Sequence, residues 1–134
     1  MGGSALILLD THAWVWWIDG SAELSRKARA AIDAAVGDKA VSVSAISCWE
    51  IGTLAQRGRL ELTMTPADWI ARCEALPFLT VVPVDARIAL RAADLPPVHK
   101  DPADRLIVAT ALALGTPLVT KDHRLAGYGV TTIW

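Results

Sequence analysis

The sequence predicts one α/β domain in which a mainly parallel sheet of about five strands is flanked by helices. Short aliphatic runs of strand length alternate with segments of helical period, which is the order expected of a parallel sheet. The first of these runs, residues 5–9, is apolar throughout, as in a central strand covered on both faces. With 134 residues and 53% apolar content, the chain can bury one core. We therefore expect a single domain over residues 1–134, with residues 1–4 as a flexible start.

The first half of the chain supplies two strand patterns, each followed by a helical pattern. The elements expected there are a strand over residues 5–9, helices over 11–19 and 25–35, a strand over 41–44 and a helix over 46–57. Tryptophan and isoleucine recur at spacings of three and four in the first helix, and the second strand alternates with period two. Ser25 caps the second helix, while Gly20 and Gly58 end the first and third.

The second half repeats this alternation. The elements expected there are a helix over residues 65–75, a strand over 79–82, helices over 85–94 and 102–114, and strands over 117–120 and 130–134. A Thr-Pro pair opens the first of these helices, and Asp101 with the following proline opens the third. The third helix is apolar on every side, which predicts burial, and Gly115 ends it. One short turn is expected between Asp122 and the last strand, which lies at a sheet edge.

Composition narrows the classes of function. The net charge of −1 gives no overall basic signature for nucleic acid, although it does not exclude RNA as a ligand. Cys48 and Cys73 lack the C-x-x-C spacing, so reduced thiols in a cytoplasmic protein are expected. No apolar run reaches the roughly 20 residues of a membrane span, and no charged segment precedes the first apolar run as in a signal peptide.

Acidic side chains occur at the ends of predicted strands and the starts of predicted helices. Asp10 and Asp122 each end a strand, Glu50 lies about one helical turn beyond another, and Asp104 opens the buried helix. Because ligands bind beyond the carboxyl ends of parallel strands, these four acids are expected to meet at one edge of the sheet. Their burial is costly unless a cation joins them. Oxygen ligands favour Mg²⁺ or Mn²⁺, which supports phosphodiester hydrolysis.

Each acid also has a purely structural interpretation. Asp101 suits an N-cap, and Asp104 suits the positive end of a helix dipole. The segment Ser47-Cys-Trp-Glu50 matches a capping box, and the remaining acids suit caps of the elements that follow them. Considered singly, the structural interpretation is favoured for Asp101 and Glu50, whereas Asp10 leans toward function. Considered together, four independent caps have no reason to cluster, and a shared ion supplies one.

Basic residues and histidines flank these acids. Two interpretations of Arg105 and Arg124 have equal weight. Either they bind substrate phosphates, or they offset the repulsion between the carboxylates. The nearby lysines are expected to offset the acidic charge or face solvent. The spacing of the histidines matches no zinc motif, and they are expected at the surface or beside the site.

The six tryptophans divide into two groups. Helical spacing predicts core positions for four of them, Trp14, Trp17, Trp49 and Trp69. Trp16 must point elsewhere, and Trp134 ends an edge strand. These two are expected at a protein interface or a base-stacking platform, with the interface preferred.

Four blocks of sequence resemble PIN-domain ribonuclease toxins of the VapC type. The blocks are Leu-Leu-Asp10-Thr-His, Ser47-Cys-Trp-Glu50-Ile, His99-Lys-Asp101-Pro-Ala-Asp104-Arg and Val-Thr120-Lys-Asp122. The resemblance implies a PIN-like three-layer sandwich, a Mg²⁺- or Mn²⁺-dependent endoribonuclease activity, a cognate antitoxin and a homodimer. It assigns the catalytic and metal-binding roles to the acidic quartet, with Asp101 and Thr120 as accessory residues. The quartet is Asp10, Glu50, Asp104 and Asp122.

Two other classes of function compete with the ribonuclease toxin. The first is a non-catalytic binding module on the same fold, which holds RNA or a protein partner without turnover. The second is a phospho-receiver or a phosphatase with an aspartate nucleophile. The segment Asp10-Thr-His12 lacks the second acid of such a phosphatase, and no acidic pair adjoins the first strand as a receiver requires.

Overall fold

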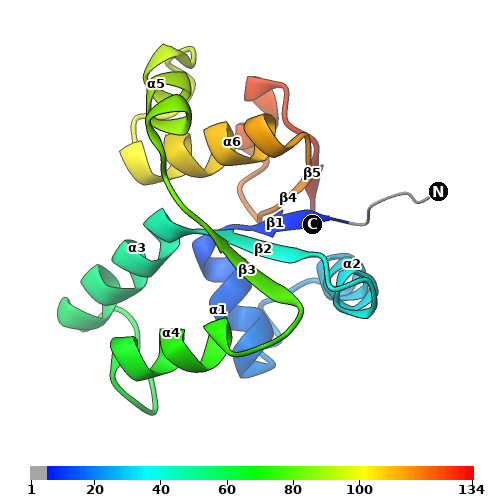
Figure 1. Cartoon of the computed structure of the whole chain (residues 1–134), viewed down its shortest axis with the longest axis vertical. Coiled ribbons are helices and arrows are strands. Elements are labelled where there is room, and N and C mark those ends of the chain that lie inside the picture. Colours follow the sequence, from blue (N-terminus) through cyan, green and yellow to red (C-terminus); the bar gives the residue numbers. More distant parts are fainter. Residues whose placement is uncertain (1–5) are drawn as a thin grey trace.

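The computed structural model describes residues 6–134, which form a five-stranded parallel sheet between helices (Figure 1). The strand order is β3-β2-β1-β4-β5, and all neighbouring strands are parallel. The strands are β1 (Ile7–Leu9), β2 (Val41–Ser44), β3 (Leu79–Val82), β4 (Leu118–Val119) and β5 (Thr132–Ile133). The predicted α/β fold class and the edge position of the last strand are confirmed. Residues 1–5 lie outside the described residues, and with them the expected flexible start and the first residue of the first strand.

Six helices and a 3₁₀ helix connect the strands of this described region. They are α1 (Thr11–Asp19), α2 (Arg26–Gly37), α3 (Ala45–Gln56), α4 (Pro66–Glu74), α5 (Ala86–Asp94), α6 (Pro102–Leu114) and η1 (His123–Tyr128). The predicted caps Ser25, Thr65 and Asp101 all accept backbone N–H groups of their helices. The single short turn expected after Asp122 is wrong. That carboxylate caps the six-residue helix η1 by accepting the N–H of Arg124.

Two cores lie on opposite faces of the sheet, because successive side chains of a strand point to opposite sides. In Figure 1, α5 and α6 lie on one side of the sheet, and α1 and α4 lie on the other. Ile7 and Leu9 pack with the side chains of α1, α2 and α4, whereas Leu8 packs with those of α6 and η1. The central strand is therefore covered on both faces, as its aliphatic run predicts.

The tryptophans follow the predictions in part. Trp14 and Trp69 are buried and their ring centroids lie 5.0 Å apart, while the partly buried Trp17 packs on Phe78. The core position predicted for Trp49 is wrong, because 62% of this residue is exposed. The buried Ile51 lies two residues away on α3, or about 200° around the helix, so the two side chains face opposite directions.

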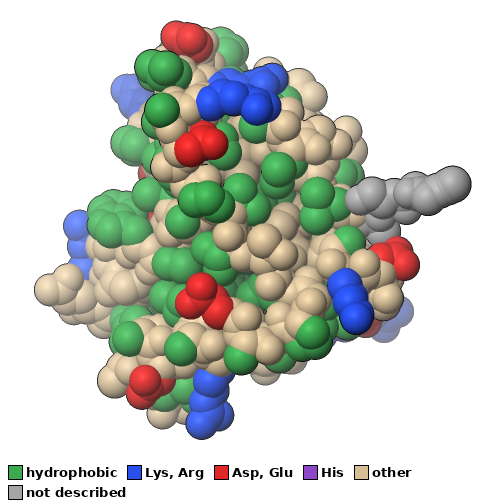
Figure 2. Space-filling view, in the orientation of Figure 1, with side chains coloured by type: hydrophobic (Ala, Val, Ile, Leu, Met, Phe, Trp, Pro, Cys, Tyr) green, Lys and Arg blue, Asp and Glu red, His purple; other side chains and the backbone are tan. Residues whose placement is uncertain are grey.

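The face that Figure 2 shows carries no extended basic patch, because its Lys and Arg side chains are scattered among apolar ones. Among residues 6–134, no helix combines the length and the apolar character needed to span a membrane.

Candidate metal and active site

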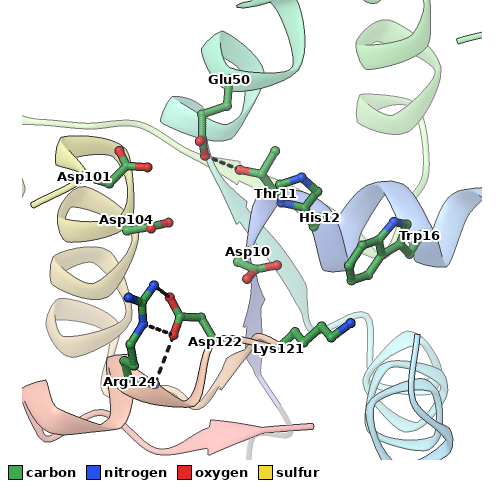
Figure 3. Close-up of a pocket in the computed structure, with 10 residues that line it drawn as sticks. All are labelled: Asp10, Thr11, His12, Trp16, Glu50, Asp101, Asp104, Lys121, Asp122 and Arg124. Atoms are coloured by element: carbon green, nitrogen blue, oxygen red, sulfur yellow. Dashed lines mark hydrogen bonds and ion pairs between the residues drawn. The ribbon is translucent and has the colours of Figure 1, made fainter. Parts of the chain in front are cut away.

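A pocket of about 450 Å³ lies where the chain leaves the carboxyl ends of β1 and β4. The strand order reverses here, since β2 and β4 flank β1 on opposite sides, and open α/β sheets bind ligands at such a point. Figure 3 shows the residues that line it: Asp10, Thr11, His12, Trp16, Glu50, Asp101, Asp104, Lys121, Asp122 and Arg124. The structure thus brings together the four acids that the sequence places at one sheet edge.

Asp10 caps α1 and faces the pocket at the same time. Its Oδ1 accepts the backbone N–H of Ala13 at 2.8 Å, and the hydroxyl of Thr120 also bonds to the carboxylate. Burial raises the pKa of Asp10 against these two hydrogen bonds, and the negative charge of Asp122 raises it further. Thr120 is itself buried, and its Oγ1 accepts the N–H of Asp122 at 3.1 Å. It therefore joins the two acids that end β1 and β4.

Glu50 reaches the pocket from α3, and the predicted capping box is wrong. The cap of α3 is Ser44, whose Oγ accepts the N–H of Ile46 at 3.2 Å, so Ser47 lies inside the helix. The Glu50 carboxylate instead accepts a hydrogen bond from the hydroxyl of Thr11, which lies 2.9 Å from the Ser47 hydroxyl. Burial raises the pKa of Glu50, and the bond from Thr11 opposes that effect.

Asp104 lies in the first turn of α6, and its carboxyl pKa is strongly raised. Burial, followed by the negative charge of Asp101, raises its pKa from 3.8 to about 7. Glu50 and Asp10 add to this repulsion from across the pocket. A carboxylate in this position gains from a neighbouring cation more than an exposed one does.

His99 was expected at the surface or beside the site, and the structure places it between two of the acids. Its Nε2 lies 3.3 Å from Asp104 Oδ2 and 3.3 Å from Asp122 Oδ2. The Asp101 N–H donates to His99 Nδ1 at 3.1 Å, so the neutral ring carries its proton on Nε2 and donates toward the carboxylates. Arg124 Nη2 lies 3.1 Å from the same nitrogen. Both groups are donors in that tautomer, and Asp122 is the acceptor they share.

Arg124 and Arg105 have different surroundings. Arg124 donates from Nε and Nη2 to the two carboxylate oxygens of Asp122, each at 3.0 Å, and lowers the pKa of Asp122. The substrate-binding role expected of Arg105 is not supported. Its guanidinium lies against the carbonyls at the end of α5 and in the following loop, and it does not line the pocket.

Asp101 lines the pocket but also accepts the N–H of Ala103 at 2.9 Å, as its predicted N-cap role requires.

The chemistry of the donors in this pocket fits a hard divalent ion. Carboxylate oxygens of Asp104 and Asp122 and a ring nitrogen of His99 lie within 4.8 Å of one another, and this nitrogen becomes a ligand only when it gives up the proton that it donates to the carboxylates. The pKa values of Asp10, Glu50 and Asp104 are all raised, with burial as the first cause and neighbouring carboxylates as a further one. Clustered carboxylate oxygens are the ligands that Mg²⁺ and Mn²⁺ prefer, and the binding of an ion would relieve this repulsion.

Comparisons with known proteins identify the family and the fold of the chain. The PIN domain family model matches residues 7–130. Ribonuclease VapC22 of Mycobacterium tuberculosis (strain ATCC 25618 / H37Rv) is 36% identical over 132 residues, which cover 96% of this chain and 98% of that protein. A solved structure of VapBC2 from Rickettsia felis, bound to a DNA fragment from their promoter, matches with a TM-score of 0.69 and 13% identity. That match covers 95% of this chain and 96% of that chain.

A solved toxin–antitoxin complex from Klebsiella pneumoniae is also similar. It matches with a TM-score of 0.62 and 22% identity, covering 94% of this chain and 96% of that chain. These two structural matches describe a shared fold, while the sequence matches cover the segments that carry the pocket acids. The resemblance drawn from the four sequence blocks is therefore confirmed.

Proposed function

The chain belongs to the PIN-domain family, and from this premise we propose that its acidic pocket is the active site of a divalent-metal-dependent endoribonuclease. The similarity to a VapC ribonuclease supports RNA as the substrate. The observation that carries the proposal is the convergence of four carboxylates, three of them with raised pKa values, at the switch point of a parallel sheet. The cofactor is Mg²⁺ or Mn²⁺.

Four carboxylates of the pocket are the proposed ligands of the ion. Asp10 and Asp104 hold the principal ion, and Glu50 and Asp122 complete its site or hold a second one. Thr11 and Thr120 orient Glu50 and Asp10 by hydrogen bonds, which fixes the direction of the carboxylate oxygens. When bound, such an ion activates water for attack on phosphorus and neutralises the charge that develops on the phosphate.

The protein also acts, in this proposal, as the toxin of a toxin–antitoxin pair. The similar structures from Klebsiella pneumoniae and Rickettsia felis are complexes, which supports a cognate antitoxin as the partner of this chain. A homodimer and a cytoplasmic location complete the proposal. A short DNA-binding protein encoded by the adjacent reading frame would support the toxin role.

The direct test replaces Asp10 by asparagine, which removes one negative charge and keeps the shape of the side chain. We expect Asp10→Asn to abolish Mn²⁺-stimulated RNA cleavage while circular dichroism and the thermal transition show a folded protein. Asp33→Asn is the matched control, because Asp33 is exposed on α2 and does not line the pocket. Unchanged cleavage by Asp10→Asn defeats the assignment. RNA binding in chelator, with no turnover by the native chain, would favour the non-catalytic binding module.

A further inference from the structure

The pocket has a second side, opposite the wall formed by α6. Figure 3 shows Asp101 at the N-cap of α6 and Asp104 in its first turn, while Trp16 on α1 and Lys121 after β4 lie across the pocket. The structure therefore places a large aromatic ring in the same pocket as the carboxylates. None of the ion-binding roles proposed above uses Trp16 or Lys121.

The Trp16 ring is held in place by its neighbours. Its centroid lies 5.9 Å from that of Trp134, with an interplanar angle of 60°, and 5.4 Å from that of His12, with an angle of 44°. Both contacts are tilted, so neither neighbour covers the ring as a parallel stacked ring would. Trp16 also packs against the apolar core below it. A ring held in this way loses little conformational freedom when it binds a second planar group.

Lys121 supplies a positive charge over this ring. Its Nζ lies 5.8 Å from the Trp16 ring centroid and 3.7 Å from Glu23 Oε2. Both Lys121 and Glu23 are about 60% exposed, so the ion pair between them is weak and the ammonium is available to another anion. Two basic side chains line the pocket, and in Figure 3 Lys121 extends toward Trp16 while Arg124 lies against Asp122.

We propose that Trp16 is a stacking platform for a nucleobase next to the scissile phosphate and that Lys121 binds a phosphate of the adjoining RNA backbone. The proposal rests on the ribonuclease function and names the part of the site that reads single-stranded substrate. Stacking on an aromatic ring suits any base, and it requires a base that is unpaired. A single-stranded segment or loop of RNA is therefore the class of substrate that fits this pocket.

A nucleobase fits this position better than a partner protein does. Trp16 shares the pocket with five carboxylates, and an anionic strand enters such a pocket best where cations flank the acids. Lys121 provides that charge over the face of the ring, and its ammonium uncovers this face when it moves to a phosphate. The sequence favours a protein interface for Trp16, and this alternative predicts a change in the oligomeric state when Trp16 is replaced.

The first test measures the affinity of a short fluorescent single-stranded RNA in the Asp10→Asn background, where turnover is lost. We expect Trp16→Leu to bind the RNA about tenfold more weakly, because leucine keeps apolar volume but offers no stacking face. Trp16→Phe should stay within about twofold of the Asp10→Asn parent, since an aromatic ring remains. Trp49→Leu is the matched control, because Trp49 is exposed on α3 and does not line the pocket.

A second test locates the stacked base. Single abasic sites are placed in turn along the same RNA around its mapped cleavage position. One of them should weaken binding to the parent by about tenfold, and Trp16→Leu should lose that sensitivity because the platform is gone.

A third test examines the phosphate contact of Lys121. Lys121→Gln should reduce the slope of log affinity against log salt by about 0.7, as expected for one lost phosphate contact on a single strand. Lys100→Gln, at an exposed lysine outside the pocket, should leave the slope unchanged.

The outcomes separate this proposal from the function on which it rests. If the native chain cleaves RNA but Trp16→Leu binds and cleaves it as the native chain does, the platform is wrong and the ribonuclease stands. The same conclusion follows if Trp16→Leu changes the oligomeric state in size-exclusion chromatography and leaves RNA affinity unchanged. If the native chain neither cleaves nor binds RNA, the proposed function itself fails. Thermal unfolding of each variant shows whether it is folded, and the pair Trp16→Phe and Trp16→Leu decides between stacking and packing.

Discussion

Arg124 holds both carboxylate oxygens of Asp122, from Nε and Nη2, at 3.0 Å each. This pair occupies the oxygens that an ion at Asp122 would need, and it is the first cause of the lowered pKa of Asp122. Arg124 is exposed, so its side chain can leave without opening the core. Arg124 and a divalent ion therefore compete for Asp122, and a substrate phosphate would favour the ion by drawing the guanidinium away.

Replacement of Arg124 by glutamine tests this competition. We expect Arg124→Gln to bind Mn²⁺ about two- to fivefold more tightly in the absence of RNA, because an exposed ion pair of this size no longer opposes the ion. Isothermal titration calorimetry measures the affinity. Lys100→Gln removes a positive charge near the same pocket without touching Asp122 and should leave the affinity unchanged. Equal or weaker binding by Arg124→Gln would contradict the competition.

Thr11 ties α1 to α3 by its hydrogen bond to Glu50. The residue is buried, and its hydroxyl also lies 2.9 Å from that of Ser47. Thr11→Val keeps the shape but leaves both partners without this bond, so we expect a free energy of unfolding lower by about 1–3 kcal/mol. Cleavage should fall by about tenfold, since Glu50 is no longer held in one direction. Urea denaturation and a fluorescent RNA substrate measure the two effects.

Thr11→Ser is the control for that change, because serine restores the hydroxyl without the methyl group. It should recover most of the cleavage rate. If Thr11→Ser cleaves as poorly as Thr11→Val, packing of the methyl group is responsible and the hydrogen bond is not.

Arg105 joins α6 to the end of α5. Its Nη2 donates to the carbonyls of Ala92 and Leu95 at 2.9 and 2.8 Å, and its Nη1 donates to that of Pro96 at 3.1 Å. Because hydrogen bonds from a charged group contribute more than neutral ones, Arg105→Gln should lower the free energy of unfolding by about 2–3 kcal/mol. Arg91→Gln, on an exposed face of α5, should change it by less than about 0.5 kcal/mol. Weaker RNA binding by folded Arg105→Gln, without loss of stability, would restore the substrate-binding role.

The acids of the site could be predicted from sequence because each occurs at a position that the fold defines. Asp10 and Asp122 follow apolar strands, and the carboxyl ends of adjacent parallel strands meet at one edge. Asp104 follows a recognisable cap and proline, so its place in the first turn of α6 was also expected. These placements depend on local patterns and on one general rule of parallel sheets.

Other parts of the site depend on contacts that no local pattern records. His99 lies in a loop, and two hydrogen bonds hold it between the two acids. Its backbone N–H donates to the Tyr128 hydroxyl, and its Nδ1 accepts the N–H of Asp101. A histidine two residues before a helix cap is the one signal that could have located it. Trp49 was misplaced because apolar residues occur on several sides of α3, so the period does not fix which side is buried.

Asp104 makes the stability of the metal-free protein depend on pH. Its pKa is about 7 in the folded protein, against 3.8 as its ordinary value in an unfolded chain. Between these two pH values the folded state binds more protons than the unfolded state, so the contribution of Asp104 to stability falls as pH rises. Above about pH 7 the carboxylate is ionised in both states, and the full cost of its buried charge is present.

Asp104→Asn removes that charge, so in chelator it should melt several degrees above the native chain at pH 8, with a much smaller difference at pH 4. Mn²⁺ should reverse the order at pH 8, because an ion that binds only the folded state stabilises it, and the asparagine variant lacks a principal ligand. Differential scanning calorimetry at the two pH values, with and without Mn²⁺, measures all four cases. Asp33→Asn controls for loss of an exposed charge and should show neither effect. A melting difference that is the same at both pH values would mean that burial does not raise the pKa of Asp104. The main electrostatic reason for an ion in this pocket would then be lost.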